Sequence, residues 1–257
     1  MNNVVSLSGG KDSTAMLHMM LERGEKIHSV IWFDTGWEFQ QMHAHIDMVE
    51  QKTGLRVWRL QSRIPFEYWL VHRPIVARAG VNKGSVYRIG NGWPSPSQRW
   101  CTKQKTDTLD AFSSPIPNAM RCIGYAADEG HRQERTSART NCRYPLIEYG
   151  ITELEALQYC YALGYDWGGL YKIFPRVSCF CCPLKSLREL ENLRRFFPEL
   201  WAKMLEWDAQ MGEHNRVFKD YDTVHDLEKR FSGGDSQILM PHRASVRDAV
   251  RLRLQRA

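Results

Sequence analysis

Apolar-rich runs alternate with stretches of helical periodicity over the first 60 residues. Runs at residues 4–7, 27–33 and 55–60 predict three buried strands. Between them, apolar residues recur at helical spacing, and Gly24 and Gly54 stand where the two helices should end. This βαβαβ order is the mononucleotide-binding pattern, and it predicts a Rossmann-like α/β fold with a doubly wound, mostly parallel sheet.

The alternation of strand and helix patterns stops over residues 64–100, where glycine and proline are interleaved with basic and aromatic residues. A segment of this length and composition is uncommon inside a compact domain and is often a binding loop or lid, although an irregular insertion is the alternative. Regular structure is expected to resume with a helix near residues 103–112 and a strand near residues 119–125.

Two capping boxes mark helix starts in the second half of the chain. Thr152-x-x-Glu155 predicts one helix. Ser186-x-x-Glu189 opens a long helical region, which Pro198 should divide in two because proline disrupts a helix interior.

The length of 257 residues suits one α/β core with an appendage. We expect a nucleotide-binding α/β domain over residues 1–185, which includes the insertion and a cysteine site, and a helical extension over residues 186–257. The tail beyond Pro241 is rich in arginine and has a single acidic residue. Such a run either tracks a phosphate backbone or forms a solvated helix face.

Composition excludes a disordered chain and favours an anionic partner. Hydrophobic residues make up 43% of the chain and charged residues 25%, as in globular proteins. Lysine and arginine exceed aspartate and glutamate by 35 to 29, which suits a nucleotide or a nucleic acid. Lys11 and Asp12 interrupt the first apolar stretch and no run approaches a membrane span, so we expect a cytoplasmic protein with reduced cysteines.

The string Ser8-Gly9-Gly10-Lys11-Asp12-Ser13 lies between the first predicted strand and the first predicted helix. Adjacent glycines let backbone N–H groups approach an anion closely, and the helix N-terminus adds further donors and a positive dipole. The lysine supplies a full charge and the serines supply hydroxyl donors. The string departs from the common P-loop spacing, but it predicts a phosphate site.

Asp34 and Thr35 directly follow the second predicted strand. The carboxyl ends of parallel strands line the ligand crevice of a doubly wound sheet. We therefore expect these two residues to face the same cavity as the loop and to hold adenine or ribose.

A second motif, Cys179-Phe180-Cys181-Cys182, precedes the second capping box. Cys179 and Cys182 form a C-x-x-C pair, and the following helix should lower their thiol pKa values. Cys101 and Cys181 are candidates for the remaining metal ligands. Thiolates without histidine fit an iron–sulfur cluster or a zinc site, and unligated or redox-active thiols are the other reading.

With the loop and the cysteines together, the chain resembles the phosphoadenosine phosphosulfate (PAPS) reductase family of the adenine nucleotide α-hydrolase superfamily. It looks closest to the members found in phages and mobile elements. The resemblance extends to about Trp207, and its landmarks occur in the family's order: the loop of Ser8 to Ser13, Asp34-Thr35-Gly36, Arg99-Trp100-Cys101 with Lys103 and Lys105, residues 123–129 with Arg132, residues 144–147, and Cys179 to Pro183.

The resemblance implies a PP-loop, in which residues 8–13 bind phosphate or sulfate and Asp34 and Thr35 hold the nucleoside. Gly124 and Arg132 should lie over the anionic end of the nucleotide. Lys11, Asp12 and Arg132 are the expected catalytic residues, with Mg²⁺ sharing the phosphate charge.

Cluster-bearing members of the family use a cysteine pair and a C-x-x-C motif, which correspond here to Cys101 and to Cys179 with Cys182. Only one cysteine stands where the pair would be. Either Cys181 supplies the fourth ligand, or three cysteines hold a cluster with one open iron.

Three functions remain open. The first is an enzyme that uses ATP to adenylylate an acceptor, DNA, tRNA or a small metabolite, for sulfur insertion. The second is a reductase of PAPS or a related sulfonucleotide that uses an external thiol, because no cysteine follows Cys182. The third is a nucleotide- or nucleic-acid-binding module with a structural metal. A sulfur or electron donor protein and a second copy of the chain are the protein partners considered.

Overall fold

The computed structural model describes residues 1–129, 141–212 and 216–233. A five-stranded sheet forms its centre, and its neighbouring strands run parallel. The strand order is β3 (Val57–Gln61), β2 (Ile27–Asp34), β1 (Asn2–Ser6), β6 (Ala119–Ile123) and β7 (Cys142–Arg143). The predicted α/β fold with a doubly wound parallel sheet is confirmed.

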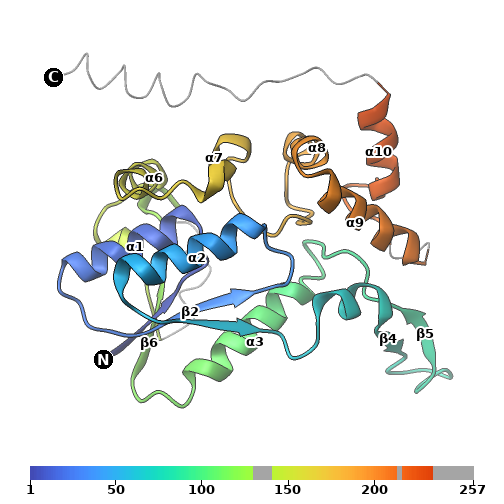
Figure 1. Cartoon of the computed structure of the whole chain (residues 1–257). Coiled ribbons are helices and arrows are strands. Elements are labelled where there is room, and N and C mark those ends of the chain that lie inside the picture. Colours follow the sequence, from blue (N-terminus) through green and yellow to red (C-terminus); the bar gives the residue numbers. More distant parts are fainter. Residues whose placement is uncertain (130–140, 213–215, 234–257) are drawn as a thin grey trace.

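Helices cover both faces of this sheet. Figure 1 shows α1 (Lys11–Glu22), α2 (Gln40–Thr53) and α6 (Glu153–Ala162) on one face and α3 (Trp100–Ser113) on the other. The central strand β1 is therefore covered twice, and Val4 and Val5 are fully buried. Shorter helical segments follow β6: η2 (Ala127–Glu129), α5 (Pro145–Glu148), η3 (Trp167–Gly169) and α7 (Leu170–Ile173).

The ends of the elements follow the sequence signals closely. Gly54 adopts φ 67° after α2, and Gly24 adopts φ 70° just after α1, a conformation that glycine reaches without strain. Both predicted capping boxes are formed, at Thr152 before α6 and at Ser186 before α8 (Leu187–Phe196). The helix expected near residues 103–112 starts earlier, at Trp100.

The predicted insertion at residues 64–100 contains regular structure. A π-helical turn, η1 (Tyr68–His72), precedes two short antiparallel strands, β4 (Pro74–Val76) and β5 (Val86–Ile89). Figure 1 shows this ribbon extending away from the body of the protein. At its base the backbone of Gly90, at φ 75°, passes so close to η1 that a Cβ would lie 2.4 Å from the Leu70 carbonyl oxygen.

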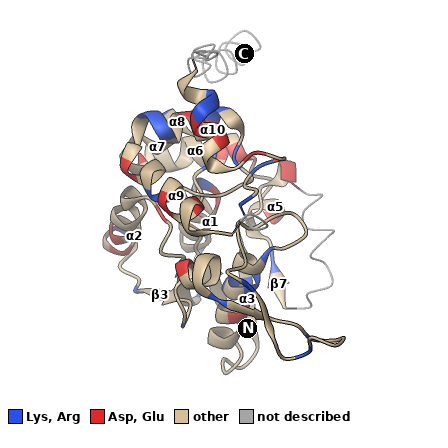
Figure 2. Ribbon diagram, turned by 90° about the vertical axis from the view of Figure 1, so that its right-hand side faces the viewer, with Lys and Arg blue, Asp and Glu red and all other residues tan. Residues whose placement is uncertain are grey.

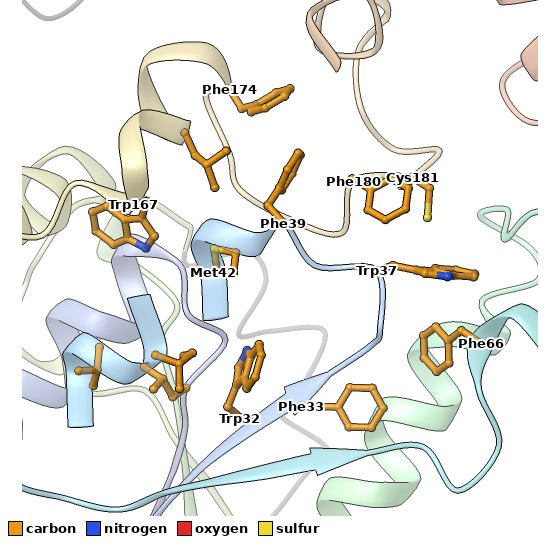
Figure 3. Packing of buried hydrophobic residues seen from close by; sticks show 14 of the residues in the cluster. Trp32, Phe33, Trp37, Phe39, Met42, Phe66, Trp167, Phe174, Phe180 and Cys181 are labelled. Carbon is orange, nitrogen blue, oxygen red and sulfur yellow. The ribbon is translucent and has the colours of Figure 1, made fainter. Parts of the chain in front are cut away.

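The C-terminal helices pack onto the aromatic end of the core. Pro198 opens α9 (Pro198–Gln210) directly after α8, as predicted, and α10 (Val224–Ser232) packs against α9. Figure 3 shows Trp37 and Phe39, which precede α2, beside Phe180 of the loop that carries Cys179 to Cys182. Phe180 also stacks on Trp207 of α9 with ring centroids 6.0 Å apart. The domain boundary at residue 185 stays a prediction, and the basic tail lies outside the described residues.

Candidate nucleotide and cysteine sites

The glycine-rich loop connects β1 to α1 in a conformation that requires glycine. Gly9 adopts φ 80°, and a Cβ there would lie 2.7 Å from Cε of Met42. Its carbonyl oxygen accepts a hydrogen bond of 2.7 Å from Nε1 of Trp167. The N-cap residue Gly10 has no side chain that could bond the first N–H groups of α1, so the loop presents a helix N-terminus to the space in front of it.

Hydroxyl groups surround this helix N-terminus. The Ser8 and Ser13 hydroxyl oxygens are 2.9 Å apart, and the backbone N–H of Lys11 donates to the Tyr171 hydroxyl at 2.8 Å. A phosphate oxygen that replaced the Tyr171 hydroxyl would gain the same donor. The loop is therefore arranged for an anion.

Lys11 is held between two carboxylates. Its Nζ lies 3.0 Å from Oδ2 of Asp12 and 2.5 Å from Oε2 of Glu153, the first residue of α6. Burial alone would lower the pKa of Lys11, but the two carboxylates outweigh it and the pKa is raised. Burial also raises the pKa of Asp12, to about 6, even though Lys11 acts against the shift.

A cavity of about 450 Å³ opens in front of the loop. Residues from distant parts of the chain line it, among them Lys11, Gly124, Glu153 and Arg176. Gly124 lies so close to α1 that a Cβ would stand 2.9 Å from the backbone nitrogen of Ser13. This close approach gives a physical reason for glycine at the position that the sequence singled out.

Asp34 does not line the loop cavity, whereas Thr35 shares a further cavity, of about 270 Å³, with Ser8 of the loop. Ile31 and Phe33 line that cavity, and Asp34, one residue further along β2, lines a separate cavity of about 430 Å³, because successive side chains of a strand point to opposite faces. The Asp34 carboxylate accepts from the Gly36 N–H at 2.8 Å and from Nε2 of Gln61 at 2.9 Å. The structure thus separates Asp34 from the loop, and nucleoside binding by this residue stays a prediction.

The four candidate metal-binding cysteines line one cavity of about 270 Å³. Cys101 comes from the first turn of α3, whereas Cys179, Cys181 and Cys182 come from the loop between α7 and α8. The Phe180 N–H donates to the Trp37 carbonyl at 2.9 Å, which fixes this loop beside the end of β2 (Figure 3).

The remaining cysteines lie elsewhere. Cys122 in β6 and Cys160 in α6 are fully buried and pack as small hydrophobic residues. Cys142 starts the short strand β7. The chain therefore gathers at one place the four thiols that the sequence selected.

The predicted lowering of the Cys179 thiol pKa is wrong. Burial raises the pKa of Cys179 well above its ordinary value, and the neighbouring Glu38 carboxyl group raises it further. The helix dipole does not compensate, because α8 begins only at Leu187. Burial likewise raises the pKa values of Cys101 and Cys181. A metal would have to displace protons from these thiols.

The donor set at this cavity fits a thiophilic metal. Four thiols without histidine suit an iron–sulfur cluster or a four-sulfur zinc site. In the described part of the chain, however, no three cysteine, histidine or acidic side chains are already arranged around a common ion position. Ligation would therefore require the thiols to reorient.

Four residues line both the loop cavity and the cysteine cavity: Ser8, Thr102, Lys105 and Val177. The two cavities are thus adjacent. Lys105 carries a positive charge at their shared wall, and its charge acts on Glu38 and Cys179.

Several site residues were missed at the sequence level. Glu153 could have been noticed, because it directly follows the capping residue Thr152, whereas nothing in the local sequence marks Tyr171, Trp167 or Arg176. Conversely, the predicted catalytic residue Arg132 lies outside the described residues.

Across the described ranges, no helix has the length and apolar character needed to cross a membrane.

Two uncharacterised proteins of Methanocaldococcus jannaschii are similar to the chain. MJ0066 is 26% identical over 237 residues, which cover 87% of this chain and 43% of the relative. MJ0973 is 22% identical over 220 residues, which cover 80% of this chain and 47% of the relative. The chain thus spans less than half the length of these relatives.

Residues 2–185 match the phosphoadenosine phosphosulfate reductase domain. The match includes the glycine-rich loop, the end of β2 and all four cysteines of the shared cavity. It supports an adenine nucleotide as the ligand of this fold. The chain belongs to the phosphoadenosine phosphosulfate reductase domain family.

Proposed function

We propose that this protein transfers AMP from ATP to an acceptor and that the cysteine cavity serves the delivery of sulfur to the activated acceptor. The observation that carries the proposal is the wall of four residues that the loop cavity shares with the cysteine cavity. A reaction at the α-phosphate would take place next to the thiols only if the two cavities adjoin.

In the first step, an acceptor oxygen attacks the α-phosphorus of ATP and the bond to the β-phosphate oxygen breaks. Pyrophosphate leaves with the electron pair of that bond. Lys11 and the N–H groups at the start of α1 stabilise the charge that develops on pyrophosphate. Attack by a sulfur nucleophile from a donor then displaces AMP from the acceptor.

Before the reaction, Lys11 must exchange a carboxylate partner for phosphate. Asp12 and Glu153 then become free to accept a cation, and Mg²⁺ commonly binds one or two carboxylates together with substrate phosphates. Mg²⁺ at this position would neutralise phosphate charge when bound. Lys105, at the shared wall, would attract the α-phosphate side of the nucleotide.

At the cysteine cavity, Cys101, Cys179 and Cys182 would hold an iron–sulfur cluster, with Cys181 as a fourth ligand or as a neighbour of an open iron. Such a cluster supplies a binding position for sulfide. Zinc in the same site would serve only to fix the loop, so metal identity separates sulfur delivery from a structural role.

The test is pyrophosphate release from ATP by anaerobically purified protein, measured with duplex DNA, with tRNA and without either acceptor, together with iron and sulfide analysis of the same sample. Because a fixed charge at a leaving group contributes strongly to catalysis, Lys11→Ala should reduce pyrophosphate release about a hundredfold or more. Lys229→Ala, on the exposed surface of α10, is the matched control and should leave it unchanged. Undiminished release in Lys11→Ala would contradict the proposal.

Family membership favours a second candidate, reduction of PAPS or a related sulfonucleotide by an external dithiol. The dithiol would supply two electrons, sulfite would leave, and the thiols would become a disulfide. Sulfite release from PAPS that depends on thioredoxin, without pyrophosphate release from ATP, would select this reaction instead.

A further inference from the structure

The segment from η1 to the first turns of α3 has an unusual charge composition. Residues 68–106 contain no aspartate or glutamate, although the chain has 29 acidic residues in 257. The same segment carries seven basic residues: Arg73, Arg78, Lys83, Arg88, Arg99, Lys103 and Lys105. Over α8 and α10, by contrast, the two signs are mixed, as Figure 2 shows, and Arg194 pairs with Glu228 at 2.8 Å.

The strands β4 and β5 and their turn, residues 74–89, form what we call the basic ribbon. Arg78 and Lys83 are exposed on it, and within the described residues neither they nor Arg88 pair with a carboxylate. Its large apolar side chains are exposed too: Val76, Val81, Val86, Tyr87 and Ile89. Within the described ranges, this ribbon offers cations that no carboxylate neutralises, together with exposed apolar side chains, to a binding partner.

The base of the basic ribbon is fixed to the body of the protein. The Gly90 N–H donates to the Arg73 carbonyl at 2.7 Å, and the Gly92 N–H donates to the Leu70 carbonyl at 3.0 Å. Trp93, only 4% exposed, follows directly and packs edge-on against Phe218 at 4.9 Å. A ligand on the ribbon would therefore be held at a defined place.

The segment that follows the basic ribbon in the chain lines the cysteine cavity. Pro94, Ser95 and Arg99, which follow the ribbon in the chain, line this cavity together with Cys101. A long anion bound along the ribbon could continue past the exposed Arg99 to the position where sulfur transfer is proposed.

We propose that the basic ribbon docks duplex DNA and presents it to the site as the acceptor, an inference that rests on the proposed function. Unpaired cations along an acid-free segment complement a phosphate backbone. The major groove of B-form DNA, about 12 Å wide, admits a two-stranded ribbon, whereas the deep, narrow major groove of A-form RNA does not.

The test is fluorescence anisotropy of a labelled DNA duplex of about 20 base pairs with the full chain, over a range of salt concentrations. Each lost phosphate contact lowers the slope of log affinity against log salt by about 0.9. Arg78→Glu/Lys83→Glu should therefore lower this slope by about 2 and weaken binding at least tenfold. The control Arg195→Glu/Lys229→Glu makes the same change of net charge on exposed cations of α8 and α10, and it should bind like the wild type.

Circular dichroism melting establishes that each variant is folded, which the exposure of these side chains favours. Equal loss of binding in both double variants, or none in either, would overturn the ribbon as the docking site. Tighter binding of an RNA duplex of the same sequence would overturn DNA as its occupant. Absence of DNA binding by the wild type would do the same.

Pyrophosphate release from ATP, measured on the same proteins with and without the DNA duplex, keeps this inference separate from the proposed function. Pyrophosphate release without ribbon-dependent DNA binding removes only the docking proposal. DNA binding through the ribbon without pyrophosphate release, even with the duplex present, removes the adenylylation proposal and leaves the docking surface.

Discussion

Two buried lysines of this chain have opposite surroundings. Lys11 is 6% exposed and has carboxylate partners in Asp12 and Glu153. Lys185 is fully buried, and its ammonium group has no hydrogen-bond partner among the residues that the structure describes. It lies 4.7 Å from the ring centroid of Phe174, and burial lowers its pKa. The carboxylates stabilise the charged form of Lys11, whereas the unpartnered ammonium group of Lys185 destabilises the metal-free protein.

Replacing Lys185 by methionine should therefore stabilise the metal-free protein. Methionine keeps most of the buried aliphatic volume and removes a buried amine without a partner, so we expect a gain of about 2 kcal/mol in the free energy of unfolding. Urea unfolding of chelator-treated protein measures it. Lys172→Met, at an exposed position of α7, should change the free energy by less than about 0.5 kcal/mol. A loss in Lys185→Met would mean that the thiols compensate the ammonium charge.

Single residues also mark where sequence reasoning stops. Residues 8–13 could be assigned to an anion site from local chemistry, because strand, glycines and helix start are contiguous in the chain. The sequence did not show that Asp34 points away from the loop cavity. A residue at the end of a strand keeps the alternation of side-chain directions only if the strand continues through it. β2 continues through Asp34, and this extra residue turns the carboxylate away from the loop.

At the scale of elements, local signals predicted helices better than short strands. Both capping boxes and the break at Pro198 were foreseen because side-chain and backbone groups a few residues apart determine them. The strands β4 and β5 were missed, since a ribbon exposed on both faces has no alternation of apolar and polar residues. Their pairing depends on a contact between distant segments, at Gly90 and Arg73.

The capping box of α8 allows a test of this local determination. The Ser186 hydroxyl accepts from the Glu189 N–H at 3.2 Å, and Glu189 accepts from the Ser186 N–H at 2.8 Å. Ser186→Ala should lower the free energy of unfolding by about 1 kcal/mol, whereas Ser186→Asp, which keeps a capping oxygen, should lower it much less. Urea denaturation of both variants measures the difference. Equal losses would show that the cap does not determine the stability of α8.

At the scale of the whole molecule, the parallel sheet brings distant segments to one edge. The loop after β1, the first turn of α3 and the cysteines near residue 180 meet at the shared wall of the two cavities. The order of these landmarks predicted the fold and the identity of the thiols. The adjacency of the thiols to the loop could not be predicted, because it arises only when the folded chain places Thr102, Lys105 and Val177 in the wall of both cavities.

Acid sensitivity of the whole fold should depend on His45, which joins α2 to the two elements next to the loop. Its Nε2 lies 2.9 Å from the Thr14 hydroxyl of α1, and its ring stacks on Trp167 with centroids 4.6 Å apart. Burial lowers the pKa of His45 to about 3, with a smaller contribution from His18, while Asp166 acts in the opposite direction.

The unfolded chain takes up this proton near pH 6.5, but the folded protein does so only near pH 3, so acidification between these values favours unfolding. At pH 5, about 1.5 units below the unfolded pKa, this titration of His45 should by itself have lowered the free energy of unfolding of the wild type by about 2 kcal/mol relative to pH 7.5. His45→Gln keeps a hydrogen-bonding side chain without the titration and should not show this loss. Urea unfolding of both proteins at pH 7.5, 6 and 5 gives the difference, with His72→Gln at an exposed position as the control. Other groups titrate equally in both proteins. If the difference in the free energy of unfolding between the wild type and His45→Gln stays constant with pH, the folded protein protonates His45 as readily as the unfolded chain does, and the prediction is wrong.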